Sequence, residues 1–222
     1  MRIGVVGAAG GIGTRLVEAI VSAPGLELAA CIVAPGSRWL GLPVCGGGIE
    51  YRAADAAINA RCDVMIDFST PAASVALQHS CADKPIPFVI GTTGFNRRQL
   101  AALKAAARHR PLLASDNFAP GFAEFLAAAA RLRAGLPGAL ETLGEERRVR
   151  RDRRSSPAEA TEIRFDAGGV EIALAHRVNT PDAYVHGALA AAHWLVASAP
   201  GPGLYTLADT FTVPVRSKEE QS

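Results

Sequence analysis

The sequence predicts an α/β fold, a doubly wound parallel sheet followed by a second, smaller α/β domain that carries an open mixed sheet. Three observations predict it. A short apolar run at residues 3–6 passes through glycines into a helical pattern. Further apolar runs of strand length alternate with Ala-rich segments as far as residue 114. Gly, Ser, Thr, Asn or Pro follow each run, which suits ligand binding beyond the carboxyl ends of parallel strands.

The composition limits the classes of function. The 222 residues carry a formal net charge of +2, with 49% hydrophobic and 20% charged residues, as in an ordinary globular protein. So small a charge argues against nucleic acid as a partner, and the apolar runs are too short to cross a bilayer. Without a signal peptide pattern, we expect a cytoplasmic protein. The four cysteines lack the spacing of zinc ligands or of a compact disulfide framework, so we expect reduced structural thiols and no metal.

The first strand and helix enclose a glycine turn. Ile3–Val6 is the expected strand, Thr14–Ser22 is the expected helix, and Gly7, Gly10 and Gly13 separate them. A helix that begins at glycines leaves its first N–H groups free at the positive end of the helix dipole, where a diphosphate can approach closely. The spacing therefore indicates a Rossmann-like dinucleotide site, with a glycine-rich turn without a ligand as the alternative.

The remaining elements of the first domain follow from apolar and helical spacing. Strands are expected at Leu26–Val33, Asp63–Phe68, Pro87–Ile90 and Pro111–Ala114, and helices at Ala53–Ala60, Ala72–Ser80 and Arg97–Arg108. Asp67 ends a buried strand and is expected to organise the loop after it. The dinucleotide-binding domain should span residues 1–118.

The second domain should span residues 119–203 and serve substrate binding and oligomerisation. It is expected to contain a helix at Phe122–Arg133 and strands at Ala139–Glu145, Thr161–Phe165 and Val170–Ala175. An open sheet of this kind needs a cover, so we expect a homo-oligomer that forms through it. Residues 204–212 can return to the first domain, and residues 213–222 are expected to be a disordered tail.

Four segments in order carry a resemblance to a known family. They are Gly7-x-x-Gly10-x-x-Gly13, Ile66-Asp67-Phe68-Ser69, Val89-Ile90-Gly91-Thr92-Thr93-Gly94-Phe95 and Ser115-Asp116-Asn117-Phe118-Ala119-Pro120-Gly121. Together they resemble the signatures of the dihydrodipicolinate reductases, which reduce a cyclic dicarboxylate of the diaminopimelate and lysine pathway with a nicotinamide cofactor. The resemblance covers residues 1–121 and resumes at 169–195, where Glu171–Arg177 and Gly187-Ala188 are similar to the family's last core strand and helix.

The resemblance implies a set of binding residues. Those that would bind the cofactor are Gly7, Gly10, Gly11, Ile12, Gly13, Arg15, Arg38, Phe68, Gly91, Thr92, Thr93, Ser115, Asn117 and Phe118. Those that would bind the substrate are Thr93, Asn117, Arg150 and Arg153. For the threonines and the asparagine, ordinary loop hydrogen bonding is the alternative.

The cofactor can be NADPH or NADH. A carboxylate at the end of the second strand would bind the ribose hydroxyls of NADH, but Val33 and Ala34 stand there instead. Arg38 follows a few residues later and can pair with a 2′-phosphate, or can be an ordinary exposed arginine. The sequence therefore favours NADPH.

Residues 145–160 depart from the family. The family's His-His-x-x-Lys motif, which serves proton transfer, falls on Val149, Arg150 and Arg153, and its Gly-Thr pair falls on Glu159 and Ala160. Arginine is a poor proton donor near neutral pH, so the catalytic residues are unknown. The arginine-rich run 147–154 can form an anion pocket, contact an acidic partner or nucleic acid, or be a solvated loop.

Two functions are compatible with these residues. The first is an NAD(P)H-dependent reductase of a small cyclic imine or unsaturated carboxylate, in the lysine and diaminopimelate pathway or as a diverged paralogue acting on another imine. The second is a catalytically impaired nucleotide-binding or interaction protein on the same fold. His176, His186 and His193 are read as packing residues rather than catalysts.

Overall fold

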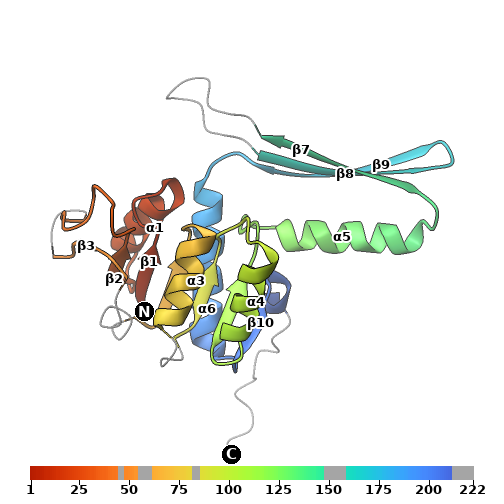
Figure 1. The fold of residues 1–222 in the computed structure, drawn as a ribbon. Helices are drawn as coiled ribbons and strands as arrows, with labels where there is room; N and C mark the ends of the chain where they lie inside the picture. Colours follow the sequence, from red (N-terminus) through yellow and green to blue (C-terminus); the bar gives the residue numbers. More distant parts are fainter. Residues whose placement is uncertain (45–47, 55–61, 82–85, 148–158, 212–222) are drawn as a thin grey trace, which may run out of the picture.

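The computed structural model describes residues 1–44, 48–54, 62–81, 86–147 and 159–211. Within them the chain forms two sheets of different kind (Figure 1). A parallel sheet with helices on both faces forms the larger body, and a long antiparallel sheet projects from it above a single helix. The predicted fold class, a Rossmann-like sheet with a smaller α/β unit, is confirmed.

The large sheet has the strand order β10-β6-β5-β4-β1-β2-β3, and every neighbouring pair is parallel. Its strands are β1 (Arg2–Val6), β2 (Glu27–Ile32), β3 (Tyr51–Arg52), β4 (Val64–Asp67), β5 (Phe88–Ile90), β6 (Pro111–Ala114) and β10 (Gly203–Tyr205). The chain runs outward from β1 in one direction to β2 and β3, and in the other direction from β4 to β6. The order therefore reverses between β1 and β4, which is where open parallel sheets bind their ligands.

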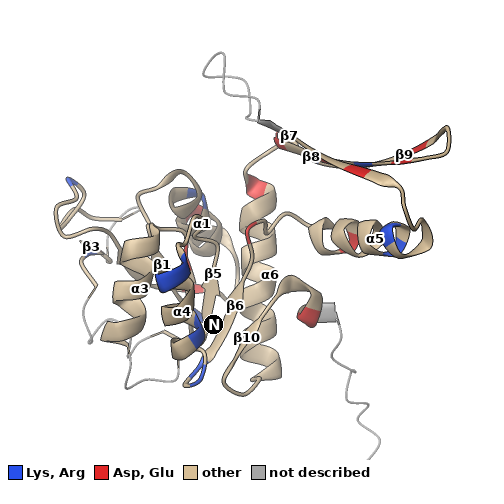
Figure 2. Ribbon diagram, turned by 45° about the vertical axis from the view of Figure 1, so that its right-hand side comes forward, with Lys and Arg blue, Asp and Glu red and all other residues tan. Residues whose placement is uncertain are grey.

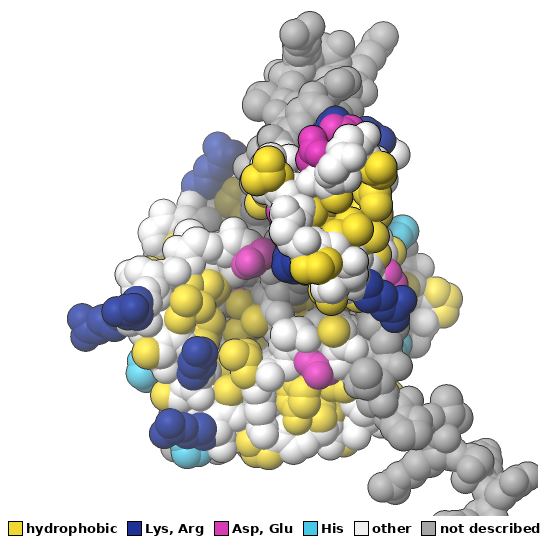
Figure 3. Space-filling model, turned by 90° about the vertical axis from the view of Figure 1, so that its right-hand side faces the viewer, with side chains coloured by type: hydrophobic (Ala, Val, Ile, Leu, Met, Phe, Trp, Pro, Cys, Tyr) yellow, Lys and Arg dark blue, Asp and Glu magenta, His cyan; other side chains and the backbone are white. Residues whose placement is uncertain are grey.

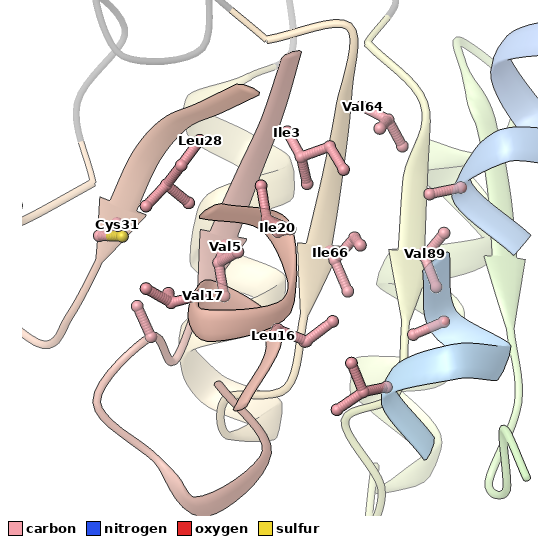
Figure 4. Close-up of a cluster of buried hydrophobic side chains, with 14 of the residues drawn as sticks. Ile3, Val5, Leu16, Val17, Ile20, Leu28, Cys31, Val64, Ile66 and Val89 are labelled. Carbon is pink, nitrogen blue, oxygen red and sulfur yellow. The ribbon is translucent and has the colours of Figure 1, made fainter. Parts of the chain in front are cut away.

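In the described part of the chain, two helices cover each face of this sheet. On one face, α1 (Gly11–Ser22) lies beside α6 (Asp182–Ser198), and on the other α3 (Pro71–Ser80) lies beside α4 (Arg97–Ala106). In Figure 4, Leu16, Val17 and Ile20 of α1 lie over apolar side chains of β1, β2 and β4, among them Val5, Leu28 and Ile66. This core and a second one on the α3 and α4 side exclude water from both faces of the sheet, so the strands hold their carboxyl ends in register.

Local signals explain where α3 and α4 begin. Thr70 caps α3 by accepting a hydrogen bond from the Ala73 N–H, and Pro71 occupies the first helical position. Asn96 caps α4, and Gln99 returns a hydrogen bond to the Asn96 N–H, which completes a capping box. Both helices therefore begin just beyond the loops that follow β4 and β5.

The smaller unit consists of α5 (Phe122–Gly135) and a three-stranded sheet. Its strands are β7 (Leu140–Arg147), β8 (Glu159–Ala167) and β9 (Val170–Val178). Phe125 and Ala129 of α5 pack on Ile163 and Phe165, which face the helix. The sheet is antiparallel throughout its described residues, so the expectation of mixed strand directions was wrong in this detail. Only Gly168 and Gly169 connect β8 to β9, a length that suits an antiparallel pair, whereas a parallel pair needs a long crossover.

The opposite face of this sheet carries no element of the described chain. Leu140, Leu143 and Val170 are exposed apolar side chains of this sheet, with 74%, 64% and 59% of their surface accessible. Leu140 lies on the outer face, opposite Asp166, whereas Leu143 and Val170 lie on the α5 face beyond its packed core. Figure 3 shows hydrophobic side chains gathered on the end of this unit. Arg164 pairs with Glu162 and Glu171 on the outer face. Charges of both signs are scattered over the described ribbon rather than collected on one side (Figure 2).

Some elements differ from the expected ones. Helix α6 lies within residues 119–203, yet Val185, Ala188 and Leu195 bury their side chains against the large sheet in the same core as α1. The strand β10 pairs with β6, and a 3-10 helix, η1 (Leu207–Phe211), follows it. Most of the helix expected at 53–60, and all of the tail 213–222, lie outside the described residues.

Candidate cofactor and substrate site

The glycine turn after β1 is shaped by close backbone contacts. Gly7 has φ +74°, and a side chain there would overlap the carbonyl of Phe68. The Gly7 carbonyl accepts a hydrogen bond of 2.8 Å from the Gly10 N–H. A Cβ on Gly13 would overlap the same carbonyl oxygen and lie 2.8 Å from Ala8 Cα. Glycine is therefore required at positions 7 and 13 for the turn to close.

The turn presents free backbone amides. Helix α1 begins at Gly11, and its N-cap residue Gly10 makes no side-chain capping bond. The first turn of α1 contains no acidic residue, and its first intrahelical bond runs from the Thr14 N–H to the Gly10 carbonyl, at 2.9 Å. The N–H groups of Gly11, Ile12 and Gly13 therefore have no partner within the helix and point toward the carboxyl edge of the sheet. Such an arrangement binds an anion.

Arg15 on the next turn of α1 contacts α6. Its Nη1 lies 2.7 Å from Asp182 Oδ1, and Thr180 Oγ1 donates to the other oxygen of that carboxylate. These hydrogen bonds, that from Arg15 first, lower the pKa of Asp182. The structure thus places Arg15 beside the glycine turn with its guanidinium engaged by the start of α6.

The loops after β4 and β5 meet beside the turn. Phe68 lies between Gly7 and Gly91, because a Cβ on Gly91 would overlap the Phe68 ring. The Phe68 ring also makes an edge contact with Phe118, with centroids 5.9 Å apart. Thr92 is buried, whereas Thr93 is exposed. Five of the proposed cofactor residues therefore come together here from four different loops.

The segment after β6 is a rigid turn. Ser115 Oγ donates to the Asn117 carbonyl at 2.8 Å, and Asn117 Oδ1 accepts from the Ala119 N–H at 2.8 Å. Gly187 of α6 lies so close to Phe118 that a Cβ would overlap the Phe118 carbonyl oxygen. The same helix that contacts Arg15 therefore fixes the segment that leads into the smaller unit.

The loop after β2 carries Arg38 in an exposed position. Its guanidinium carbon lies 5.2 Å from the ring centroid of Trp39. Ser37 Oγ accepts from the Trp39 N–H at 3.2 Å, so the loop holds Arg38 near the end of β2. The Val33 N–H donates to the carbonyl of Arg52, which adds a second arginine at this edge.

The smaller unit approaches the site through β8 and β9. Tyr184 of α6 donates a hydrogen bond to the carboxylate of Glu159, the first residue of β8. His176 of β9 contacts the Pro120 carbonyl through Nε2 at 3.0 Å, and its ring lies against Phe122 and Phe125. The described parts of β8, β9 and α6 thus meet near the start of α5. Val149, Arg150 and Arg153 lie outside the described residues.

Sequence reasoning missed several of these contacts. The Arg15–Asp182 and Tyr184–Glu159 pairs join residues far apart in the chain, and no local sequence pattern predicts them. Gly187 had a usable signal, since a glycine within an apolar Ala-rich helix indicates a close backbone approach. In the part of the chain that the structure describes, no group of His, Cys, Asp or Glu side chains is arranged to hold a metal ion. No helix among the same residues has the length and apolar character to span a membrane.

Comparisons with known proteins agree with this geometry. The family model described as "Dihydrodipicolinate reductase, N-terminus" matches residues 1–118. The 4-hydroxy-tetrahydrodipicolinate reductase of Alkalilimnicola ehrlichii is 40% identical over 126 residues, which are 54% of this chain and 47% of that protein. The enzyme of the same name from Acinetobacter baumannii strain AYE is 37% identical over 126 residues, covering 54% and 46%. The matched part of the chain thus spans about half the length of these curated relatives.

Solved structures extend the likeness to the whole fold. The dipicolinate-bound dihydrodipicolinate reductase from Paenisporosarcina sp. TG-14 superposes with a TM-score of 0.69 at 18% identity, covering 93% of this chain and 97% of that one. A DAP dehydrogenase of C. glutamicum in complex with DAP gives a TM-score of 0.62 at 10% identity, covering 93% and 92%. The family model covers more than half of the residues, including the glycine turn, the loops after β4 and β5 and residues 115–118 after β6, so the chain belongs to the dihydrodipicolinate reductase family.

Proposed function

We propose that the protein is an NAD(P)H-dependent reductase of a small cyclic imine or unsaturated carboxylate. The observation that carries the proposal is the set of free amides at the start of α1. Gly7 and Gly13 frame these amides, and a side chain at either position would overlap backbone atoms. The relatives named 4-hydroxy-tetrahydrodipicolinate reductase support the same reaction class. The substrate would belong to the lysine and diaminopimelate pathway, or would be another imine if the protein is a diverged paralogue.

The residues fit a dinucleotide. The N–H groups of Gly11, Ile12 and Gly13 would hold the diphosphate, because the helix dipole favours a negative charge there. Arg38 would pair with a 2′-phosphate, since no carboxylate follows β2 at Val33 to repel it. This pairing makes NADPH the proposed cofactor, with NADH as the alternative.

The nicotinamide end would lie over the loops after β4, β5 and β6. The bound cofactor supplies the hydride. Gly91 leaves room for the Phe68 ring, and Thr93 and Asn117 would orient the nicotinamide amide and a substrate carboxylate. The packed Phe68 and Phe118 rings would exclude water from one side. Arg150 and Arg153 would add positive charge for a carboxylate-bearing substrate.

One observation favours a second candidate, a nucleotide-binding protein with impaired catalysis. Glu159 falls at the position where the resemblance implies a glycine that grips a substrate carboxylate, and its own carboxylate accepts a hydrogen bond from Tyr184. A carboxylate at that place repels an anionic substrate. General acid–base help contributes about 10²–10⁴-fold to such rates, so its loss would leave binding with little turnover.

The test of the proposed function uses Gly10→Asp with Gly10→Asn as its matched control. Both side chains cap the helix and should fold, because the only tight neighbour of a Cβ at Gly10 is the Gly7 carbonyl at 3.1 Å. Only Asp adds a charge that repels a diphosphate. We expect consumption of NADPH with a cyclic imine carboxylate, lost in Gly10→Asp and partly kept in Gly10→Asn. Cofactor binding without turnover across a panel of cyclic imines would favour the second candidate.

We also propose a homo-oligomer in the cytoplasm. The exposed apolar side chains of Leu140, Leu143 and Val170 on the three-stranded sheet support association through β7–β9. Light scattering coupled to size exclusion should give a mass above the 23.1 kDa of one chain. A monomer at micromolar concentration would contradict the association.

A further inference from the structure

We infer that Asp67 is a positioning residue for the nicotinamide end of the cofactor site, where its Oδ1 joins the loop after β4 to the loop after β5. This inference rests on the proposed cofactor function. The side chain is assigned no contact with the cofactor itself. It acts through the two loops that it holds together.

Asp67 occupies the centre of the carboxyl edge of the sheet. It is the last residue of β4 and stands in register with Val6 of β1 and Ile90 of β5, with none of its surface exposed. An acidic side chain at such a place is costly unless it is well hydrogen bonded. Its place at the reversal of strand order therefore calls for a structural or functional reason.

The hydrogen bonds of Asp67 connect two separate loops. Oδ1 accepts from the Ser69 N–H at 3.0 Å, from Ser69 Oγ at 2.5 Å and from Thr92 Oγ1 at 3.1 Å. The Ser69 N–H also lies 2.9 Å from Thr92 Oγ1, so the two loops contact each other directly as well. One carboxylate oxygen thus fixes Ser69 after β4 and Thr92 after β5.

These two loops shape the surface on which the nicotinamide would lie. Phe68 stands between Asp67 and Ser69, and its ring touches Gly91, which precedes Thr92. The Gly91 N–H donates to the Asp67 carbonyl at 2.9 Å. A shift of Ser69 or Thr92 would therefore move both the Phe68 ring and the backbone of residues 91–93.

The network acts through one oxygen only. Within the described residues, neither Asp67 Oδ2 nor Ser74 Oγ of α3 has a hydrogen-bond partner. Burial raises the pKa of Asp67, and the hydrogen bonds from Ser69 and Thr92 oppose that rise. An Asn side chain keeps the accepting Oδ1 and replaces only Oδ2, so Asp67→Asn should preserve the arrangement of the loops.

The experiment compares two ligands that differ only in the nicotinamide end. NADPH and 2′-phospho-ADP-ribose are titrated into the wild-type protein, Asp67→Ala, Asp67→Asn and a matched control, Asp63→Ala. Asp63 lies just before β4 at its opposite end and pairs with Arg2 there. We expect Asp67→Ala to weaken NADPH binding about tenfold, the scale of lost hydrogen bonds to a charged group. Its binding of 2′-phospho-ADP-ribose should stay within about twofold of the wild type on the same scale.

The outcomes separate this inference from the proposed function. Recovery of NADPH binding in Asp67→Asn, with Asp63→Ala unchanged, supports the positioning role. Equal weakening of both ligands by Asp67→Ala, or no weakening of either, overturns it while leaving the cofactor site in place. A wild-type protein that binds neither ligand overturns both. If Asp67→Ala does not fold, Thr92→Val removes the bridging hydroxyl, and the same selective loss of NADPH binding is expected.

Discussion

Replacing Gly13 with alanine tests how the glycine turn is built. A Cβ at this position would overlap the Gly7 carbonyl oxygen and lie 2.8 Å from both Ala8 Cα and the Gly7 carbonyl carbon. These atoms belong to the backbone and cannot rotate away. Forcing extra volume into such a place costs about 1–3 kcal/mol, and the better helix propensity of alanine returns up to about 1 kcal/mol. We expect Gly13→Ala to lower the free energy of unfolding by about 1–2 kcal/mol.

Gly11→Ala is the matched control, because a Cβ there meets no atom within 4 Å. It should leave stability unchanged or raise it slightly. Urea denaturation followed by circular dichroism measures the stability of both variants, and titration with NADPH measures how well the turn binds the cofactor. Gly13→Ala should bind NADPH more weakly than Gly11→Ala, since the displaced Gly7 carbonyl shifts the amides of residues 11–13. Equal stability and equal NADPH binding in the two variants would refute the account of the turn.

Three further predictions concern other parts of the molecule. Gly187→Ala should lower the free energy of unfolding by about 1–3 kcal/mol in urea denaturation, because its Cβ would overlap the Phe118 carbonyl; wild-type stability would show that α6 can move away. The Arg2 guanidinium lowers the pKa of Asp63, so the stability that their pair contributes is present above the ordinary carboxyl pKa. This stability is lost as the pH falls through the lowered pKa of Asp63 in the folded protein. In thermal melts below pH 4, acid should therefore lower the melting temperature of Asp63→Asn less than that of the wild type. Burial raises the pKa of the Cys62 thiol to about 11, so iodoacetamide should modify Cys62 only on unfolding, as peptide mass spectrometry can check; rapid labelling of the folded protein would contradict this.

The strand and helix alternation of the large sheet could be predicted because its core residues repeat at regular spacing. Boundaries were less accurate where tertiary contacts overrule propensity. Helix α1 begins at Gly11 rather than Thr14, because Gly13 fits beneath the Gly7 carbonyl despite the weak helix propensity of glycine. Strand β3 consists of Tyr51 and Arg52 alone, too short a run to give a periodic signal.

The candidate site was predictable only where function depends on local backbone shape. The glycines of the turn have a spacing that can be read directly. The pairs Arg15–Asp182 and Tyr184–Glu159 depend on α6 crossing the large sheet, a packing choice that the Ala-rich pattern of that helix leaves open. The network around Asp67 depends on side chains from two loops meeting at one oxygen. The sequence indicates that Asp67 is buried but not which donors reach it.

The central claim is that the free amides of residues 11–13 at the start of α1 bind a dinucleotide diphosphate. Isothermal titration calorimetry of the wild-type chain with NADPH and with NADH tests it most directly. We expect saturable binding of at least one reduced cofactor at one site per chain, abolished by Gly10→Asp. Absence of binding heat for both cofactors at millimolar excess, across several temperatures, would contradict it.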